Sequence, residues 1–255
     1  QTSSWKDRPS TRNCAGDTSI ALSMISDDSF YMEMKKDYAP EMVTAFIRLN
    51  GATVGCVANR SEVYTDGEKT ATYDAALTAA GCEKAAAFVN FCNAFEIPVL
   101  TLVNVDGYKN CKCNEKKIAK AAARLTYAFA NADVPKVTVV VGKANGTAGL
   151  TMNSKSIGSD IVYAWKNAKI GVMEAAPAVK IMYADEIAKA DNAAALINEK
   201  AAQYNEMQAS ALAAAKRGYV DDIIEASETR QRVVAAFEML FTKREDRPSK
   251  KHGTI

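Results

Sequence analysis

The sequence predicts an α/β fold in which helices cover both faces of a mostly parallel sheet. Continuous apolar runs at 98–105 and 136–141 are typical of strands that are buried on both faces. A stretch with helical apolar periodicity separates them, and strand, helix and strand together form a right-handed βαβ unit. The alternation indicates helices on both sides of the sheet. No internal repeat or linker interrupts the pattern, so we expect one domain.

The N-terminal part of the sequence predicts a flexible segment, a short helix and a β-hairpin. Residues 1–16 are polar, which predicts a flexible N-terminal segment, and 18–25 predicts a short helix. The stretch 43–59 predicts a β-hairpin because its two apolar runs meet at Asn50-Gly51, the strongest short turn signal.

Two amphipathic helices flank the buried strand at 98–105. Each places four apolar side chains at helical spacing on one face. These are Phe88, Phe91, Cys92 and Phe95 in the first helix, which begins near Glu83, and Ile118, Ala122, Leu125 and Phe129 in the second.

The C-terminal part continues the alternation. Its expected elements are strands at 161–165 and 168–173, helices at 175–187 and 191–217, a short apolar segment at 219–224 and a helix at 228–242. Gly218 suits the position just after a helix end, and Ser227 is the expected N-cap of the last helix.

Composition excludes some classes of partner. The 255 residues include 32 Lys and Arg against 30 Asp and Glu, a net charge of +2, which gives no reason to expect a nucleic-acid partner. No apolar run reaches the roughly 18 residues that span a bilayer. The N-terminus has no apolar signal-peptide core, so we expect a cytoplasmic protein.

The cysteines predict a reduced protein without a metal. Cys56, Cys82 and Cys92 lie in apolar or helical contexts and are expected in the core. Cys111 and Cys113 form a C-x-C pair, but zinc takes about four ligands, and the chain has no second pair and a single, distant His. We therefore expect no metal site and a reducing compartment.

One glycine-rich loop stands out. The stretch "GKANGTAGLTMNSK", 142–155, follows a buried strand directly. A strand, a glycine-rich turn and a helix start can point several backbone N–H groups into one hollow, where they could hold a phosphate or a developing oxyanion. A tight turn that needs glycine for a positive φ is the structural alternative. No serine-nucleophile elbow or standard nucleotide-binding loop occurs in the sequence.

Longer stretches resemble one family. They are "FVNFCNAFEIPVLTLVNVDGY", "ADVPKVTVVVGKANGTAGLTMNSKSIGSDIVYAWKNAKIGVM", "AAKRGYVDDIIEASETRQRVVAAFEML" and the closing "KKHGTI". In this order they resemble the C-terminal half of the biotin-dependent carboxyltransferases. That family includes propionyl-CoA and acetyl-CoA carboxylase β-type chains and glutaconyl- and methylmalonyl-CoA decarboxylase α chains.

The resemblance implies a fold and a set of partners. The fold would be a crotonase-like spiral of ββα units with outer helices, and residues 17–255 would form a carboxyltransferase C-terminal-type domain. The chain would need a partner chain that supplies the N-terminal half, and a biotin carboxyl carrier protein. The complex would be a homo- or hetero-oligomer without a membrane span of its own, although its partners could attach it to a membrane pump.

The resemblance also implies a chemistry and a site. Carboxyl transfer runs between N1 of biotin and the α-carbon of an acyl-CoA, and it needs N–H donors rather than a side-chain nucleophile. The backbone N–H groups of Thr147 and Ala148 correspond to the family's oxyanion donors on the biotin side. The implied substrate- or biotin-binding residues are Gly146, Gly149, Gly107, Tyr108, Glu174 and Ala175.

The site departs from the family pattern at several positions. Thr147 replaces a Gly, which would be strained if its φ were positive. Gly149 replaces a Tyr, which is expected to open the pocket. Glu174 replaces another Gly, and Pro177 falls where a further Gly is usual.

Three functions remain open at this point. The first is an active carboxyltransferase subunit with a reshaped pocket, and the second is a catalytically degenerate scaffold subunit of such a complex. The third is a crotonase-type acyl-CoA hydratase or isomerase, which would need a pocket carboxylate such as Glu174.

Overall fold

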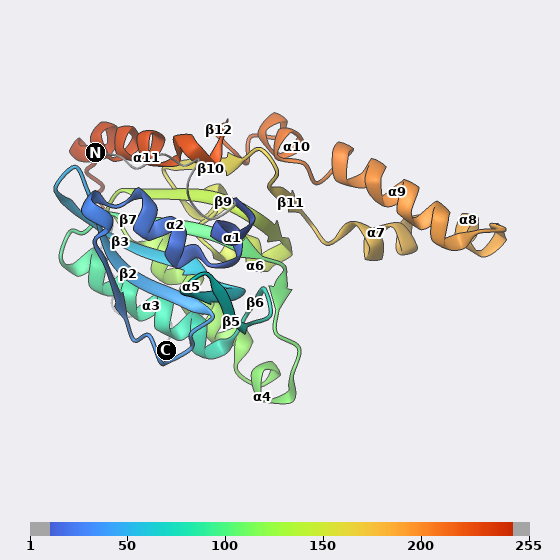
Figure 1. Ribbon diagram of the computed structural model, residues 1–255, viewed down its shortest axis with the longest axis horizontal. Helices are drawn as coiled ribbons and strands as arrows, with labels where there is room; N and C mark the ends of the chain where they lie inside the picture. Colours follow the sequence, from blue (N-terminus) through green and yellow to red (C-terminus); the bar gives the residue numbers. More distant parts are fainter. Residues whose placement is uncertain (1–10, 247–255) are drawn as a thin grey trace.

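A mostly parallel sheet forms the centre of the molecule (Figure 1). The computed structural model describes residues 11–246; the expected flexible residues 1–10 and the closing motif at 250–255 lie outside that range. In spatial order the sheet contains β1 (Tyr31–Met34), β2 (Met42–Leu49), β3 (Ala52–Asn59), β7 (Val99–Val105), β9 (Lys136–Asn145), β10 (Ile161–Trp165) and β12 (Asp222–Ile224), with β11 (Lys169–Gly171) beside β9.

The pairing of neighbouring strands changes once across the sheet, from antiparallel to parallel. β1, β2 and β3 pair antiparallel, and every pairing from β3 to β12 is parallel. The expected hairpin is confirmed, because Asn50 and Gly51 connect β2 and β3 with φ values of 50° and 79°. Two positive φ values are what a two-residue hairpin turn of this kind requires.

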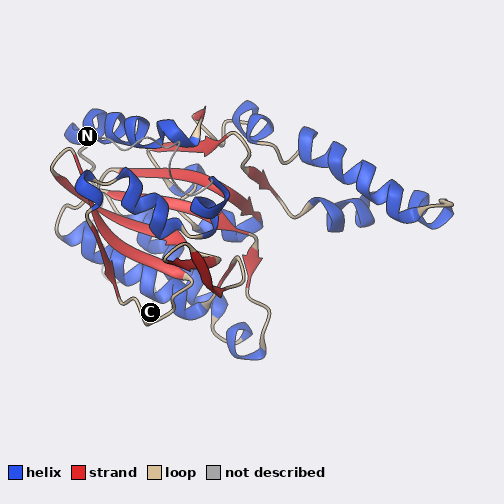
Figure 2. Ribbon diagram, in the orientation of Figure 1, coloured by secondary structure: helices blue, strands red, loops and turns tan. Residues whose placement is uncertain are grey.

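Helices cover both faces of the sheet, as predicted (Figure 2). α3 (Ala79–Ala94) and α5 (Ile118–Asn131) pack on one face, and α1 (Thr11–Gly16), α2 (Thr18–Ile25) and α11 (Thr229–Met239) pack on the other. Neighbouring strand residues such as Leu102 and Val103 belong to opposite cores, which explains why the strands are apolar throughout rather than alternating.

Smaller elements complete the described chain. They are β4 (Glu62–Thr65), β5 (Glu68–Thr72), β6 (Ala76–Leu77), β8 (Gly107–Tyr108), α4 (Lys112–Glu115), α6 (Gly146–Thr151), α10 (Ala211–Lys216) and, in the described residues, four short 3₁₀ helices, of which Ala226–Glu228 precedes α11. Cys56, Cys82 and Cys92 are buried, which confirms their assignment to the core.

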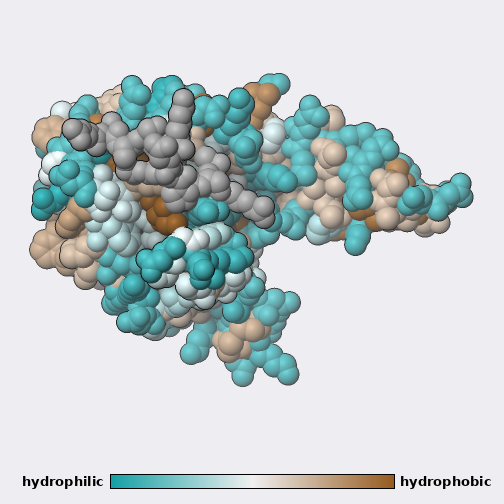
Figure 3. Space-filling view, in the orientation of Figure 1, coloured by the Kyte–Doolittle hydropathy of each residue, from teal (hydrophilic) through white to brown (hydrophobic). Residues whose placement is uncertain are grey.

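Three helices project from this body as an arm (Figure 1). The arm consists of α7 (Ala175–Met182), α8 (Ala184–Lys189) and α9 (Ala193–Met207), which pack on one another. No residue of α8 or α9 is buried, and apolar patches lie between hydrophilic side chains on the face seen in Figure 3. Ile181 and Met207 are each 69% exposed.

Three local expectations were wrong. The segment 11–16 is helical, with Cys14 fully buried, so it is not loose. The expected helix at 191–217 is interrupted before α10, because the Ser210 hydroxyl accepts the N–H of Ala213 and begins a new helix. Ser227 is not the cap of α11.

A different N-terminal cap precedes the last helix. Glu225 and Glu228 form a reciprocal capping box around the 3₁₀ turn that precedes α11. At the end of α10, Gly218 has a φ of 79°, and the N–H of Tyr219 donates to the carbonyl of Ala214. Gly218 is therefore the predicted left-handed residue after a helix end.

Phe91 and Phe95 also differ from expectation. Both belong to the predicted apolar face of α3, yet they are 47% and 65% exposed, and their rings contact each other. Within residues 11–246, no helix is long and apolar enough to cross a membrane.

Candidate functional site

Two loops meet at the carboxyl ends of the adjacent parallel strands β7 and β9. The carboxyl ends of neighbouring parallel strands are a common place for ligand sites in open α/β sheets. Here they border a hollow of about 380 Å³, which is within the range of small-ligand sites. Its lining residues are Asp106, Gly107, Tyr108, Asn145, Gly146, Thr147, Ala148, Val172, Met173, Glu174 and Pro177. We call this space the carboxyl-end hollow.

The hollow gathers six of the eight residues singled out from the sequence. Ala175 is buried at the start of α7 and does not line it. Gly149 lines a neighbouring cavity of about 650 Å³ that shares Gly146 and Thr147 with the hollow. That second cavity has largely apolar walls, including Val140 and Ile170.

Gly146 takes the strained position in the loop. Its φ is 57°, a left-handed conformation that glycine adopts at little cost. A Cβ on Gly146 would lie 3.0 Å from the carbonyl oxygen of Val172. Thr147 has no positive φ, so its replacement of a family glycine introduces no backbone strain at that residue.

Thr147 and Ala148 offer backbone donors to the hollow. They occupy the first turn of α6, where N–H groups have no partner inside the helix. Among the described residues, neither N–H is donated to a hydrogen-bond acceptor. Thr147 is exposed and Ala148 is buried, so the pair spans the rim and the wall of the hollow.

Tyr108 lines the hollow from β8. The neighbouring N–H of Lys109 donates to Leu77 of β6, and Leu77 pairs in register with Tyr108. The Tyr108 hydroxyl lies 3.4 Å from that of Thr151 in α6, which ties the two loops together.

Gly149 lies where α6 approaches the end of β9 closely. A Cβ at this position would lie 2.7 Å from the carbonyl carbon of Ala144, a distance that real side chains do not tolerate. The absence of a side chain therefore allows α6 to pack closely against the end of β9.

A charged cluster at the hollow was missed in the sequence. The Lys143 ammonium lies 2.8 Å from Asp106 Oδ2 and also pairs with Glu174. The Asn145 amide donates to Asp106 Oδ1 at 2.5 Å. Asp106 directly follows β7, and Lys143 and Asn145 end β9, so their places at adjacent strand ends were the signal that could have found them.

The cluster holds its carboxylate in the ionised form. Burial raises the pKa of Asp106, but hydrogen bonds from Lys143 and Asn145 outweigh it and leave the pKa below the usual 3.8. Burial lowers the pKa of Lys143, and the carboxylates of Asp106 and Glu174 outweigh this and raise it above 10.5. Glu174 therefore lies beside a charged lysine and not alone in an apolar pocket.

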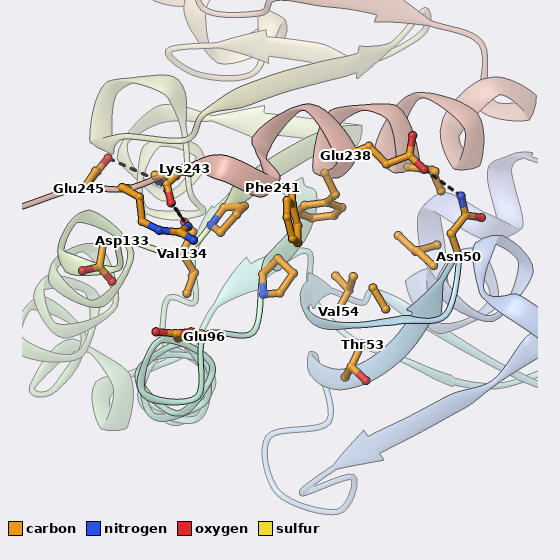
Figure 4. A pocket seen from close by; sticks show the side chains of 17 residues that line it. Asn50, Thr53, Val54, Glu96, Asp133, Val134, Glu238, Phe241, Lys243 and Glu245 are labelled. Atoms are coloured by element: carbon orange, nitrogen blue, oxygen red, sulfur yellow. Dashed lines mark hydrogen bonds and ion pairs between the residues drawn. The ribbon is translucent and has the colours of Figure 1, made fainter.

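The larger cavity of about 670 Å³ lies at the other end of the sheet (Figure 4). Pro98 and Pro135, which precede β7 and β9, line it, so it is at the amino ends of the strands. Its apolar wall includes Phe237 and Phe241. We call it the amino-end cavity.

Four polar side chains of the amino-end cavity form two pairs with one another. Lys243 pairs with Glu245 and, outside the lining, with Asp160 at 2.9 Å. The Asn50 amide donates to Glu238. Size alone favours this cavity as a site, but the free backbone donors lie at the carboxyl-end hollow, so we take the hollow as the candidate site.

No cluster suitable for a metal ion occurs in the part of the chain that the structure describes. None of its His, Cys, Asp and Glu side chains gather in groups of three or more that could hold one. Asp221 and Asp222, the adjacent carboxylates of the β12 segment, pair separately with Lys155 and Arg232.

Comparisons of the sequence with known proteins agree on one family. The sequence model of the carboxyl transferase domain matches residues 3–255. The chain is 40% identical to the methylmalonyl-CoA carboxyltransferase 12S subunit of Propionibacterium freudenreichii subsp. shermanii, covering 94% of this chain and 44% of that protein. It is also 40% identical to the methylmalonyl-CoA decarboxylase subunit alpha of Propionigenium modestum, covering 97% and 46%.

Solved structures agree with the sequence matches. A crystal structure of transcarboxylase 12S, with methylmalonyl-CoA and methylmalonic acid bound, superposes with a TM-score of 0.87 at 40% identity, over 97% of this chain and 46% of that one. The β subunit of Pseudomonas aeruginosa geranyl-CoA carboxylase gives 0.75 at 25% identity, over 93% and 44%. The crotonase-like fold class is thereby confirmed. The chain spans less than half the length of these relatives.

Proposed function

The chain belongs to the carboxyl transferase domain family, and from this premise we propose that it is a carboxyltransferase subunit of a biotin-dependent acyl-CoA carboxylase or decarboxylase. The observation that carries the proposal is the pair of unused backbone N–H groups, on Thr147 and Ala148, in the carboxyl-end hollow. Such donors stabilise an oxygen on which negative charge develops, and carboxyl transfer from biotin develops charge on the ureido oxygen.

The residues of the hollow fit a biotin headgroup. The ring system needs donors for its ureido oxygen and apolar contacts for its remaining atoms. Thr147 and Ala148 provide the donors, while Val172 and Pro177 provide apolar wall. Lys143 pairs with both nearby carboxylates and offsets part of their negative charge, which would otherwise repel a developing negative charge more strongly.

Each part of the chain has a defined role in this account. When bound, biotin supplies the carboxyl group that is exchanged with the α-carbon of the acyl-CoA. Gly146 sets the turn that aims the two N–H groups, and Gly149 holds α6 against β9. Because the donors are backbone groups fixed by a helix start, they are preorganised and need no rearrangement during the reaction.

We propose that a partner chain supplies the other half of the site. Apolar side chains close to the hollow are exposed, with Val172 76% exposed. The related transcarboxylase 12S is described as a hexamer. A hetero-oligomer with an N-terminal-half chain and a biotin carboxyl carrier protein follows from this proposal.

We also propose a cytoplasmic location. None of the six cysteines forms a disulfide in the structure, which is usual in a reducing compartment.

Acyl-CoA thioesters, which the names of the relatives mention, are the proposed second substrate.

The crotonase-type hydratase or isomerase is less well supported. Its proposed base, Glu174, pairs with Lys143 and lies about half exposed, so it is neither buried nor alone in the pocket. The scaffold alternative makes a different prediction, which is a complex that assembles without turnover.

Native purification tests the proposal. The chain should be isolated gently with its partners, and mass spectrometry should identify a biotinylated protein and an acyl-CoA-binding half. Decarboxylation of malonyl-, methylmalonyl- and glutaconyl-CoA should then be measured with and without avidin, which sequesters biotin. Avidin-sensitive turnover supports the proposal.

Two results would contradict it. An assembled complex with no turnover on any acyl-CoA would support the scaffold function. Decarboxylation by the chain without a biotinylated partner, unaffected by avidin, would contradict the role of biotin.

A further inference from the structure

Cys111 and Cys113 lie in contact at the start of the short helix α4. Their Sγ atoms are 2.9 Å apart; Cys111 is the N-cap of α4 and Cys113 lies within it, on a segment that stands off the body at the bottom of Figure 1. Cys113 is exposed and Cys111 is partly exposed. The other four cysteines of the chain are buried, so this pair differs from all of them in access to solvent.

Hydrogen bonds of Asn114 hold the segment with the two thiols in place. Asn114, which is 5% exposed, accepts the N–H of Ala79 in α3 and donates its amide to the carbonyl of Lys109, both at 2.7 Å. These two bonds close the segment from 109 to 114 and anchor it to the body. The backbone that carries the two thiols is therefore held in place by hydrogen bonds.

The two sulfur atoms are not equivalent. A hydrogen bond from Cys113, together with the backbone N–H of Asn114, lowers the pKa of the Cys111 thiol. The same hydrogen bond raises the pKa of Cys113. Four lysines and one glutamate lie between 109 and 117, which further favours an anionic sulfur. By contrast, burial raises the pKa values of Cys82 and Cys92 to about 12.

We propose that Cys111 and Cys113 form a thiol–disulfide exchange site that reacts with low-molecular-weight disulfides such as oxidised glutathione. Cys111 is the attacking thiolate and Cys113 is the resolving thiol. The proposal is independent of the carboxyltransferase function, because it rests on the geometry of the pair and its loop.

The exchange has two balanced steps. The Cys111 thiolate attacks one sulfur of the small disulfide, the S–S bond of that molecule breaks, and one thiolate leaves. Cys113 then loses its proton to the departing thiolate and attacks the Cys111 sulfur of the mixed disulfide, releasing the second small thiolate. The protein loses two hydrogen atoms in total, and one disulfide molecule is reduced to two thiols.

Mass spectrometry of the intact native complex tests the site. The complex is incubated with oxidised glutathione, quenched with an alkylating reagent and digested, and the peptide with both cysteines is compared between wild type and single variants. In wild type, this peptide should lose two hydrogens and take up no label, while Cys82 and Cys92 stay reduced. Cys113→Ser should accumulate a glutathione adduct on Cys111, and Cys111→Ser should accumulate little adduct on Cys113.

A second measurement compares the two thiols directly. Alkylation by neutral iodoacetamide near pH 6.5 should be several-fold faster at Cys111 in Cys113→Ser than at Cys113 in Cys111→Ser, because the thiolate is the reacting form. Three outcomes would overturn the proposal: adducts that form equally on either cysteine, independent oxidation without an internal disulfide, or no reaction in the native complex when the unfolded chain reacts.

Discussion

The two ends of the parallel strands carry cavities of opposite character. The amino-end cavity is the larger, at about 670 Å³ against about 380 Å³ for the carboxyl-end hollow. Several of its polar side chains are paired, as Lys243 is with Glu245 and Asn50 with Glu238. The smaller hollow is lined by glycine-rich backbone with donors that have no partner. The difference teaches that unsatisfied donors, and not volume, mark the candidate site.

The largest effect is expected from removing one donor. Thr147→Pro deletes the N–H in the first turn of α6, where proline costs no helical hydrogen bond. Carboxyl transfer should fall by about 10²–10³-fold, the typical cost of one oxyanion donor. Thr147→Ala keeps the N–H and should retain activity within a few-fold. Steady-state transfer rates of the native complex measure both, and equal losses in the two variants would remove the backbone donor from the mechanism.

A smaller effect is expected from the turn that aims the donors. Gly146→Ala places a side chain at a positive φ and 3.0 Å from the Val172 carbonyl, and should lower the free energy of unfolding by about 1–3 kcal/mol. Gly51→Ala, at the other end of the sheet, has a similar φ and nothing within 4 Å, so it isolates the backbone cost. Urea unfolding compares them. A Gly146→Ala penalty no larger than that of Gly51→Ala would show that the close approach to Val172 does not matter.

Lys143 should matter for activity more than for stability. Lys143→Met leaves Asp106 and Glu174 without their shared cation, and carboxyl transfer should fall about tenfold, or ~1.4 kcal/mol, while Lys143→Arg should lose less. The partners are about one-third to one-half exposed, so the ion pairs should add only about 1 kcal/mol or less to stability. Transfer rates of Lys143→Met equal to wild type would contradict the proposed neutralising role.

The same ion pairs should stabilise the fold only within a defined pH range. The pKa of Asp106 is lowered, so its stabilising contribution is present above pH 3.8 and is lost as pH falls through the lower folded value. The pKa of Lys143 is raised, so its contribution is present below pH 10.5 and is lost as pH rises through the higher folded value. The difference in unfolding free energy between wild type and Lys143→Met should therefore be flat near neutrality and shrink at both extremes. A maximum at either extreme would contradict these directions.

The smallest effect is expected at the amino-end cavity. Phe241 is 79% exposed, and Phe241→Ala should change transfer rates by less than about twofold and unfolding free energy by about 0.5 kcal/mol, as is typical of surface changes. A loss of transfer comparable to that of Thr147→Pro would show that the functional site is the amino-end cavity, which contradicts our assignment.

Local sequence patterns predicted most of the body. Continuous apolar runs identified β7 and β9, and Asn50-Gly51 identified the hairpin, because these signals act over a few residues. The cap at Ser227 failed because Glu225 and Glu228 form a competing capping box. Ala-rich composition predicted helices between 175 and 217, but it contains no information on their direction, so the projecting arm could not be foreseen.

The site was only partly predictable for the same reason. The loop at Gly146–Ala148 could be named because its glycines are close in sequence. The cluster of Asp106 and Lys143 depends on the parallel pairing of β7 and β9, which brings together residues 37 apart. The close approach of Gly149 to Ala144 could not be predicted, because it depends on how α6 packs.

A structure of the native complex with biotinyl-lysine would test the central claim most directly. The account predicts that the ureido oxygen lies about 2.7–3.1 Å from the backbone nitrogens of Thr147 and Ala148, the spacing of working oxyanion donors. A biotin headgroup bound at the amino-end cavity, or one in the hollow whose ureido oxygen is out of reach of both nitrogens, would contradict it.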